Sequence, residues 1–232
     1  MEPGTVLPPG KSRSMKQRIR DIFRQYDPGL ERARQTVADK RDGDRPRDGD
    51  WNIYRPAADY KSSEQPLRPA AVLIPLVDRE EGLTVLLTKR AAHLKTHSGQ
   101  VSFPGGRCDQ EDAHAMDTAL RETQEEVGID RAHIEVLGAM EDYETMTGFL
   151  ITPVVGIIAP EFKLIVAEEE VDEAFELPLD YILDEANHDL RDGIWKERKR
   201  YYYALINEQH NVWGATAAML VRFAHLVNRG VK

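Results

Sequence analysis

The segment FPGGRCDQEDAHAMDTALRETQEEVGI, residues 103–129, joins a Pro-Gly-Gly turn, an acidic loop and a helix-forming run that ends in clustered glutamates. From Asp112 to Val127 the chain contains no Pro or Gly and is rich in strong helix formers. Gly128 follows at a position suited to ending a helix. The pattern therefore predicts a helix over 112–127, directly after a rigid turn.

The predicted helix separates apolar from acidic side chains. With about 3.6 residues per turn, an apolar stripe runs from Met116 to Val127. The opposite face carries Glu122, Glu125 and Glu126. Most charge runs belong to solvated surfaces, but like charges one turn apart repel, and only Arg121 is spaced to reach one of them, Glu125. Two interpretations stay open: a surface helix, or a site for Mg²⁺ or Mn²⁺, which prefer carboxylate oxygens.

The turn at 104–106 supplies the other half of the metal-site interpretation. Gly105 and Gly106 admit backbone angles closed to other residues and permit close approach of a ligand. Pro104 stiffens the entry to the turn. We therefore expect a strand-loop-helix unit that holds a metal near the sheet, with both glycines lining the substrate.

The rest of the chain is dominated by strand-like runs. Residues 70–78 and 83–90 are β-rich and are joined by a Gly-containing turn, which predicts a hairpin. Further strands are expected at 100–103, 134–141, 149–159, 162–167, 170–178 and 194–206. A turn to helix is expected after Pro178, and a closing apolar helix at 215–227. The predicted fold is an α+β sandwich with a central mixed sheet and helices on its faces.

We predict two parts, an N-terminal arm over 1–60 and a domain over 61–232. The arm is rich in Pro, Arg, Asp and Gly, and its segment 38–50 has too few apolar groups to fold alone. Within it, residues 14–26 form a basic amphipathic pattern that predicts a short helix. Packing on the body or on a dimer partner is favoured for this helix over membrane contact.

Charge and composition restrict the function further. Residues 1–50 carry 12 Lys and Arg against 9 Asp and Glu, which leaves 19 against 31 in the rest. The excess of acidic residues after residue 50 argues against nucleic-acid binding, which needs a basic surface. It is compatible with a phosphate substrate when a divalent cation mediates the contact. The single cysteine, Cys108, and the lack of a long apolar run predict a cytoplasmic protein without stable membrane association. A homodimer stays open.

The acidic helix resembles the signature of the Nudix hydrolases. The run RETQEEVGI, residues 121–129, matches the second half of that signature, with Thr123 at its small-residue position. The first half departs from it, because Gly106 and Asp112 align only if the loop has one inserted residue. If no insertion is assumed, Arg107 occupies the glycine position of the signature and Ala113 occupies its first acid position.

The departure and the flanking motifs resemble the coenzyme A pyrophosphatase subgroup. Residues 86–106, LLTKRAAHLKTHSGQVSFPGG, are similar to the motif that this subgroup carries before its Nudix box, with Lys95 where arginine is common. Segments 169–183 and 212–217 resemble further patterns of the subgroup. The resemblance implies a Nudix α/β/α sandwich and metal-dependent cleavage of CoA or acyl-CoA to 3',5'-ADP and 4'-phosphopantetheine or its acyl form.

The resemblance also implies roles for matched residues. It makes Glu122 and Glu126 the principal metal ligands, Glu125 a ligand or base, and Arg121 the residue that orients the glutamates. A second candidate for the base is Glu170, with its neighbours Glu169 and Glu173 as further choices. The basic residues after the first hairpin, Lys89, Arg90 and Lys95, either meet the 3'-phosphate of CoA or form an exposed strand end.

Two other functions remain as alternatives. A Nudix pyrophosphatase could act on ADP-ribose or another nucleoside diphosphate derivative, which a comparison of rates on CoA and ADP-ribose would separate. A protein of a different class could bind a nucleotide or metabolite without catalysis. The intact Arg-Glu and Glu-Glu pairs at 121–122 and 125–126 argue against that second alternative.

Overall fold

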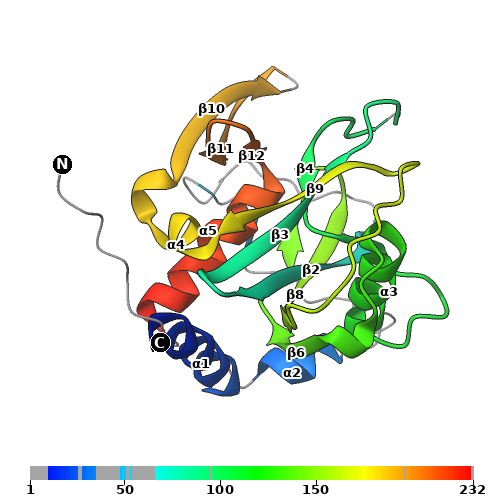
Figure 1. The fold of residues 1–232 in the computed structure, drawn as a ribbon. Coiled ribbons are helices and arrows are strands. Elements are labelled where there is room, and N and C mark those ends of the chain that lie inside the picture. The colour runs from blue at the N-terminus through cyan, green and yellow to red at the C-terminus, as the bar shows by residue number, and fades with distance from the viewer. Residues whose placement is uncertain are drawn as a thin grey trace.

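The computed structural model describes residues 10–25, 28–34, 48–50, 53, 66–94, 96–195 and 197–230. It contains a central mixed sheet covered by helices and a smaller antiparallel sheet beside it (Figure 1). This arrangement confirms the predicted α+β class and the mixed central sheet. Lys95 and much of the predicted linker lie outside the described residues.

Two long strands form the middle of the central sheet. β2 (Arg68–Arg79) and β8 (Phe149–Ile158) run parallel through ten paired residues. Both are almost continuously apolar, as expected for strands buried on both faces. A tight turn at 80–81 leads from β2 into antiparallel β3 (Gly82–Arg90), so the predicted hairpin is confirmed.

Shorter strands complete both sheets. The central sheet adds β1 (Asp48–Gly49), β4 (Val101–Ser102), β5 (Gly105–Arg107), β6 (Ile134–Ala139), β7 (Tyr143–Glu144) and β9 (Val171–Pro178). Its order is β1-β7-β8-β2-β3-β4, with β5 on β2, β6 on β8 and β9 on β3. The small sheet consists of β10 (Asp189–Trp195), β11 (Arg198–Ile206) and β12 (Asn211–Trp213). Short 3-10 helices span η2 (Arg131–His133) and η3 (Glu185–Asn187).

The helices cover the two faces of the central sheet. Successive side chains of a strand point to opposite faces, so Leu73 and Ile74 of β2 enter different apolar clusters. The Leu73 face is covered by α3 (Ala115–Val127), and α2 (Pro28–Ala33) packs at its β6 edge. The Ile74 face is covered by α1 (Gly10–Gln25), α4 (Leu179–Leu183) and α5 (Ala215–Arg229) (Figure 1).

Helix α1 packs on the body of the domain. Its apolar side chains Ile19 and Phe23 are buried in the same cluster as α5. Arg18 donates to the carbonyl oxygen of Val227 at 2.9 Å, and Arg20 forms a two-pronged ion pair with Glu135 of β6. The basic side chains of the amphipathic pattern therefore bind α5 and the sheet edge. Within the described ranges, no helix combines the length and apolar character needed to cross a lipid bilayer.

Three predicted elements differ from the structure. Helix α3 begins at Ala115, three residues later than predicted, because Asp112 binds the helix from outside it. Segment 162–167 is not a strand, since its backbone bonds to the end of α3, including Ile165 N to Val127 O at 3.0 Å. Residues 194–206 form parts of two strands, and the turn between them includes Glu197 with φ of 61°.

Candidate active site

Strand β5 brings the backbone of the Gly-Gly pair against both the sheet and α3. Gly105 has φ of 152°, and a Cβ there would lie 2.5 Å from the carbonyl oxygen of Ala71. A Cβ on Gly106 would lie 2.6 Å from the carboxyl carbon of Glu122. Only glycine at 106 therefore lets the Glu122 carboxylate rest directly on the strand.

Asp112 ties the acidic loop to the first turns of α3. Its Oδ2 accepts hydrogen bonds from the Asp109 N–H at 3.0 Å, from Thr118 Oγ1 at 2.8 Å and from Arg121 Nη2 at 2.9 Å. Burial alone would raise the pKa of Asp112, but the hydrogen bonds from Arg121, Asp109 and Thr118 outweigh burial and hold the pKa below its usual value. Asp112 therefore stays ionised as a fixed partner of Arg121.

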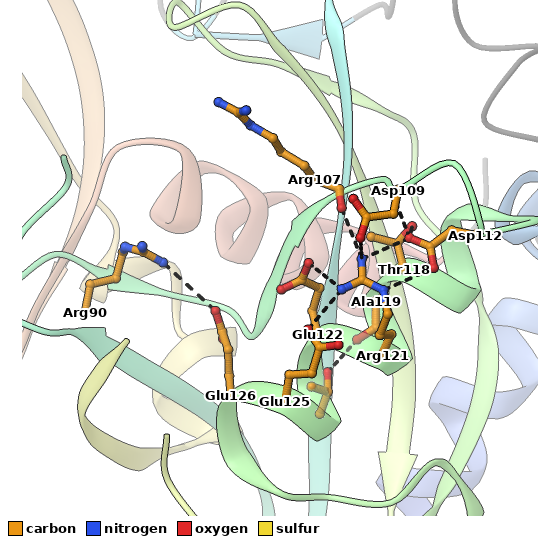
Figure 2. Close-up of polar contacts among 11 residues, drawn as sticks. Arg90, Arg107, Asp109, Asp112, Thr118, Ala119, Arg121, Glu122, Glu125 and Glu126 are labelled. Atoms are coloured by element: carbon orange, nitrogen blue, oxygen red, sulfur yellow. Dashed lines mark hydrogen bonds and ion pairs between the residues drawn. The ribbon is translucent and has the colours of Figure 1, made fainter. Parts of the chain in front are cut away.

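Arg121 is the centre of a polar cluster (Figure 2). Besides Asp112, its guanidinium donates to Glu122 Oε1 at 2.9 Å, to Glu125 Oε2 at 3.0 Å and to the carbonyl oxygen of Arg107 at 3.2 Å. The predicted contact between Arg121 and Glu125 is present. One guanidinium thus holds two glutamates of α3 and the loop before it in a single geometry.

The three glutamates do not share one face, contrary to the sequence prediction. The side chain of Glu125 is 58% exposed, that of Glu122 is 16% exposed and that of Glu126 is 4% exposed. Residues seven apart share one face of a helix, because seven residues make about two turns. Glu126 therefore lies on the same face of α3 as fully buried Ala119, the face toward the sheet. The acidic cluster therefore runs from the solvent into the interior.

Glu126 is a buried carboxylate without enough partners. Within the described part of the chain its Oε2 has no hydrogen-bond partner, and its Oε1 lies 4.0 Å from Arg90 Nη1. Burial and then the charge of Glu122 raise the pKa of Glu126 to about 8, against the lowering effects of Arg90 and the Gly105 N–H. Removing a charge from water is costly unless a counter-charge replaces the lost solvation. A bound cation would supply that counter-charge.

The residues present fit a divalent cation bound through few protein ligands. Glu122 and Glu126 lie one helical turn apart near β5, and burial raises the pKa of Glu122 as well, although Arg121 opposes it. In the part of the chain that the structure describes, no three acidic, His or Cys side chains converge into a closed metal cage. Mg²⁺ commonly uses one or two carboxylates together with water and substrate phosphates, so an open pair suits it.

Comparison with known proteins identifies the strand-loop-helix unit. A family model described as the NUDIX domain matches residues 66–202, which include β5, the acidic loop and α3. The chain belongs to the Nudix family. It is a Nudix hydrolase, and Nudix hydrolases generally use divalent metal ions.

Similar Nudix proteins cover most of the chain. A Salmonella dublin protein described as an uncharacterized Nudix hydrolase NudL is 42% identical over 75% of this chain and 89% of its own length. A Pectobacterium atrosepticum protein of the same description is 41% identical over 68% of this chain and 81% of its own length. The crystal structure of a MutT/nudix family protein from Enterococcus faecalis is 18% identical, with a TM-score of 0.44, over 73% of this chain and 65% of that chain.

A second acidic segment approaches the Nudix helix. The backbone N–H of Ala167 donates to the carbonyl oxygen of Glu126, and that of Ala91 donates to the carbonyl oxygen of Glu170, both within 3.0 Å. The charge of Glu170 contributes to the raised pKa values of Glu122 and Glu126, which places it in their neighbourhood. By contrast, Glu173 is paired with His210 at 3.0 Å.

The predicted substrate residues are only partly brought together. Arg90 ends β3 beside Glu126, Gly106 lies against Glu122, and the N–H of Gly105 faces Glu126, whereas Lys95 is outside the described residues. Sequence reasoning missed Thr118, whose hydroxyl fixes Asp112. Its position, six residues after an acid that precedes a helix, is too common a pattern to have marked it.

Proposed function

We propose that this Nudix hydrolase cleaves the pyrophosphate bond of CoA or acyl-CoA, with Mg²⁺ or Mn²⁺, to give 3',5'-ADP and 4'-phosphopantetheine or its acyl form. The observation that carries the proposal is the buried carboxylate of Glu126, whose Oε2 has no hydrogen-bond partner among the described residues, beside Glu122 at the Gly-Gly strand. The choice of CoA is supported by residues 86–106, which resemble the motif of the coenzyme A pyrophosphatase subgroup. These residues begin in β3, pass Arg90 at its end and continue to β5. One continuous motif thus borders the glutamates.

The glutamates are assigned distinct roles. Glu122 and Glu126 would hold the cation, and Glu125 would be a further ligand or the base. When bound, the cation neutralises phosphate oxygens and lowers the pKa of a coordinated water. Arg121 positions Glu122 and Glu125 through its bonds at 2.9 and 3.0 Å, so neither carboxylate needs to reorganise on substrate binding.

Two carboxylates are proposed as the base that takes the proton of the attacking water. Glu125 is solvent-exposed but is held by Arg121. Glu170 is exposed, and its backbone is held by a hydrogen bond from the Ala91 N–H to the Glu170 carbonyl oxygen. Comparing Glu125→Gln with Glu170→Gln decides between them, since loss of the base lowers kcat by about 10²–10⁴-fold.

The substrate is proposed to enter beside Arg90. Its side chain is 27% exposed and its guanidinium faces Glu126, so it can reach a phosphate oxygen that also contacts the cation. Lys95 is proposed to add a second positive charge, and the backbone of Gly105 and Gly106 lets the pyrophosphate approach the strand. We assign this chemistry to residues 61–232 and propose a small-molecule substrate, a cytoplasmic location and no nucleic-acid partner.

Turnover of matched substrates tests this function. We expect kcat/KM for CoA or acyl-CoA with Mg²⁺ to exceed that for ADP-ribose, and Glu126→Gln to lower turnover by at least about 100-fold. A preference for ADP-ribose would support the alternative Nudix pyrophosphatase. Full activity of the Glu126→Gln protein would contradict the assignment of Glu126 as a metal ligand. Glu161→Gln, on the exposed segment after β8, is a matched control that should keep wild-type rates.

A further inference from the structure

Arg107 points away from the carboxylate cluster although its backbone belongs to it. Successive side chains of a strand alternate, and Gly106 faces Glu122, so the Arg107 side chain lies on the other face of β5. Figure 2 shows it extending away from Arg121. Its backbone carbonyl oxygen nevertheless accepts a hydrogen bond from Arg121 Nη2 at 3.2 Å.

Strand pairing places a second arginine and an aromatic ring on the same face as Arg107. Arg107 is paired with Ala70 of β2, and Arg68, two residues earlier, is paired with Phe149 of β8. The guanidinium of Arg68 lies 3.9 Å from the centre of the Phe149 ring, and that of Arg107 lies 5.4 Å from it. One ring therefore holds two cations close together.

This arginine pair keeps its positive charge available. Arg68 donates to the carbonyl oxygen of Thr147 at 2.7 Å, which fixes its position without neutralising it. Within the described ranges, neither Arg68 nor Arg107 forms an ion pair with a carboxylate, whereas Arg20, Arg79 and Arg121 do. In a chain of net charge −9, two guanidiniums on one ring that have no carboxylate partner in the described segments make a local attraction for an anion.

The position of the pair indicates a phosphate separate from the scissile linkage. Arg90, not Arg107, lies on the Glu126 side, where the pyrophosphate is proposed to bind. Arg107 follows Gly106 directly on β5, so the arginine pair lies across this one strand from Glu122 and can be reached only by a group separate from the one at the glutamates. CoA carries such a second group, the 3'-phosphate of its adenosine half, and ADP-ribose does not.

We propose that Arg107, supported by Arg68 and Phe149, binds the 3'-phosphate of the nucleotide substrate and selects CoA over nucleotides that lack this group. The inference rests on the proposed function, because it assumes that the pyrophosphate lies at the Glu122 and Glu126 pair. Guanidinium is suited to the task, since its planar fork matches two oxygens of a phosphate. Arg107 is thereby a specificity residue, and the cleavage chemistry does not depend on it.

A comparison of CoA with dephospho-CoA isolates the 3'-phosphate. We expect Arg107→Ala to lower kcat/KM for CoA by about 10–100-fold, in line with a lost charge-assisted hydrogen bond, and to leave the value for dephospho-CoA much less affected. Arg107→Lys should retain part of the preference. Arg24→Ala, a 71% exposed arginine on α1, removes the same charge elsewhere and should leave the ratio of the two values unchanged. Equal losses on both substrates, or no loss, would overturn the proposal.

Equilibrium binding separates this inference from the proposed function. With Mg²⁺ present, calorimetry on wild-type protein and Arg107→Ala should show tighter binding of 3',5'-ADP than of 5'-AMP only when Arg107 is intact. This reading needs no turnover. If wild-type protein fails to cleave CoA, the proposed function is wrong, and the ratio of the two affinities still decides the role of Arg107. An unchanged ratio in Arg107→Ala would refute that role.

Discussion

The Glu126 carboxylate lies 4.0 Å from the Arg90 guanidinium at one oxygen and, among the residues that the structure describes, has no hydrogen-bond partner at the other. Arg90 is too distant for a strong hydrogen bond, so it compensates the buried charge only in part. Glu122, one turn earlier on α3, adds a second negative charge to the same region. The pair is therefore unfavourable in the metal-free protein, and a divalent cation bound between the two carboxylates, as proposed, would make it favourable.

The stability of the metal-free protein should fall as the pH rises. The pKa of Glu126 is about 8 in the folded chain and has its ordinary value of 4.5 in the unfolded chain. Proton binding by Glu126 therefore stabilises the folded state fully below pH 4.5, and this stabilisation is lost as the pH rises through 8. Between pH 6 and pH 8.5 the loss should be about 2–3 kcal/mol. Urea unfolding in EDTA measures it, with Glu126→Gln as the variant that lacks this titration. The same pH slope in both proteins would contradict the assignment.

The two adjacent glycines should respond differently to alanine. Gly106→Ala places a methyl group against the Glu122 carboxylate, which can move, so kcat/KM should fall about 10–100-fold while the free energy of unfolding changes by less than about 1 kcal/mol. Gly105→Ala combines φ of 152° with a clash against the Ala71 backbone and should cost about 2–4 kcal/mol. Parallel kinetics and urea unfolding check both. A fully active Gly106→Ala protein would mean that the Glu122 position is unimportant.

Replacing Arg121 by lysine should separate charge from geometry. Lysine keeps the positive charge but cannot bind Asp112, Glu122 and Glu125 through one planar fork. We expect kcat to fall about 10–100-fold, with a weaker apparent affinity for the metal. Titration of activity with Mg²⁺ provides the measurement. Arg131→Lys, an exposed arginine near the start of β6, is the matched control and should behave as wild type.

Asp112 should matter for stability more than for metal binding. Its side chain is 6% exposed and is bound by Arg121, Thr118 and the Asp109 backbone. Asp112→Ala leaves part of Arg121 without its buried partner and should lower the free energy of unfolding by about 2–4 kcal/mol. Thermal or urea unfolding measures this loss. An apparent Mg²⁺ affinity that falls more than about tenfold would instead make Asp112 a metal ligand.

Elements with strong periodicity were predictable from the chain alone. The β2–β3 hairpin and α5 follow their alternating and helical patterns, and the body of α3 follows from its helix formers and Gly128. Segment 162–167 is apolar enough for a strand, but its backbone partners are at the end of α3, a contact that no local pattern reveals. The β10–β11 turn was missed because Glu197, which has a positive φ there, is not a typical turn residue.

One contact within the candidate site was predictable from the sequence, but the electrostatics of the site were not. The helical i to i+4 spacing predicted the contact of Arg121 with Glu125. The burial of Glu126 was not foretold, because the residue two turns before it, Ala119, is small and gives a weak apolar signal. Strand pairing far apart in sequence brings Arg107 and Arg68 to Phe149, so that arrangement required the sheet register.

Product analysis of CoA hydrolysis tests the central claim most directly. The full chain is incubated with CoA in Mg²⁺ or in EDTA, and the products are identified by mass spectrometry. If Glu122 and Glu126 hold the catalytic cation as proposed, we expect equal amounts of 3',5'-ADP and 4'-phosphopantetheine with Mg²⁺ and none in EDTA. Intact CoA under both conditions, cleavage at a different bond, or equal rates without metal would contradict it.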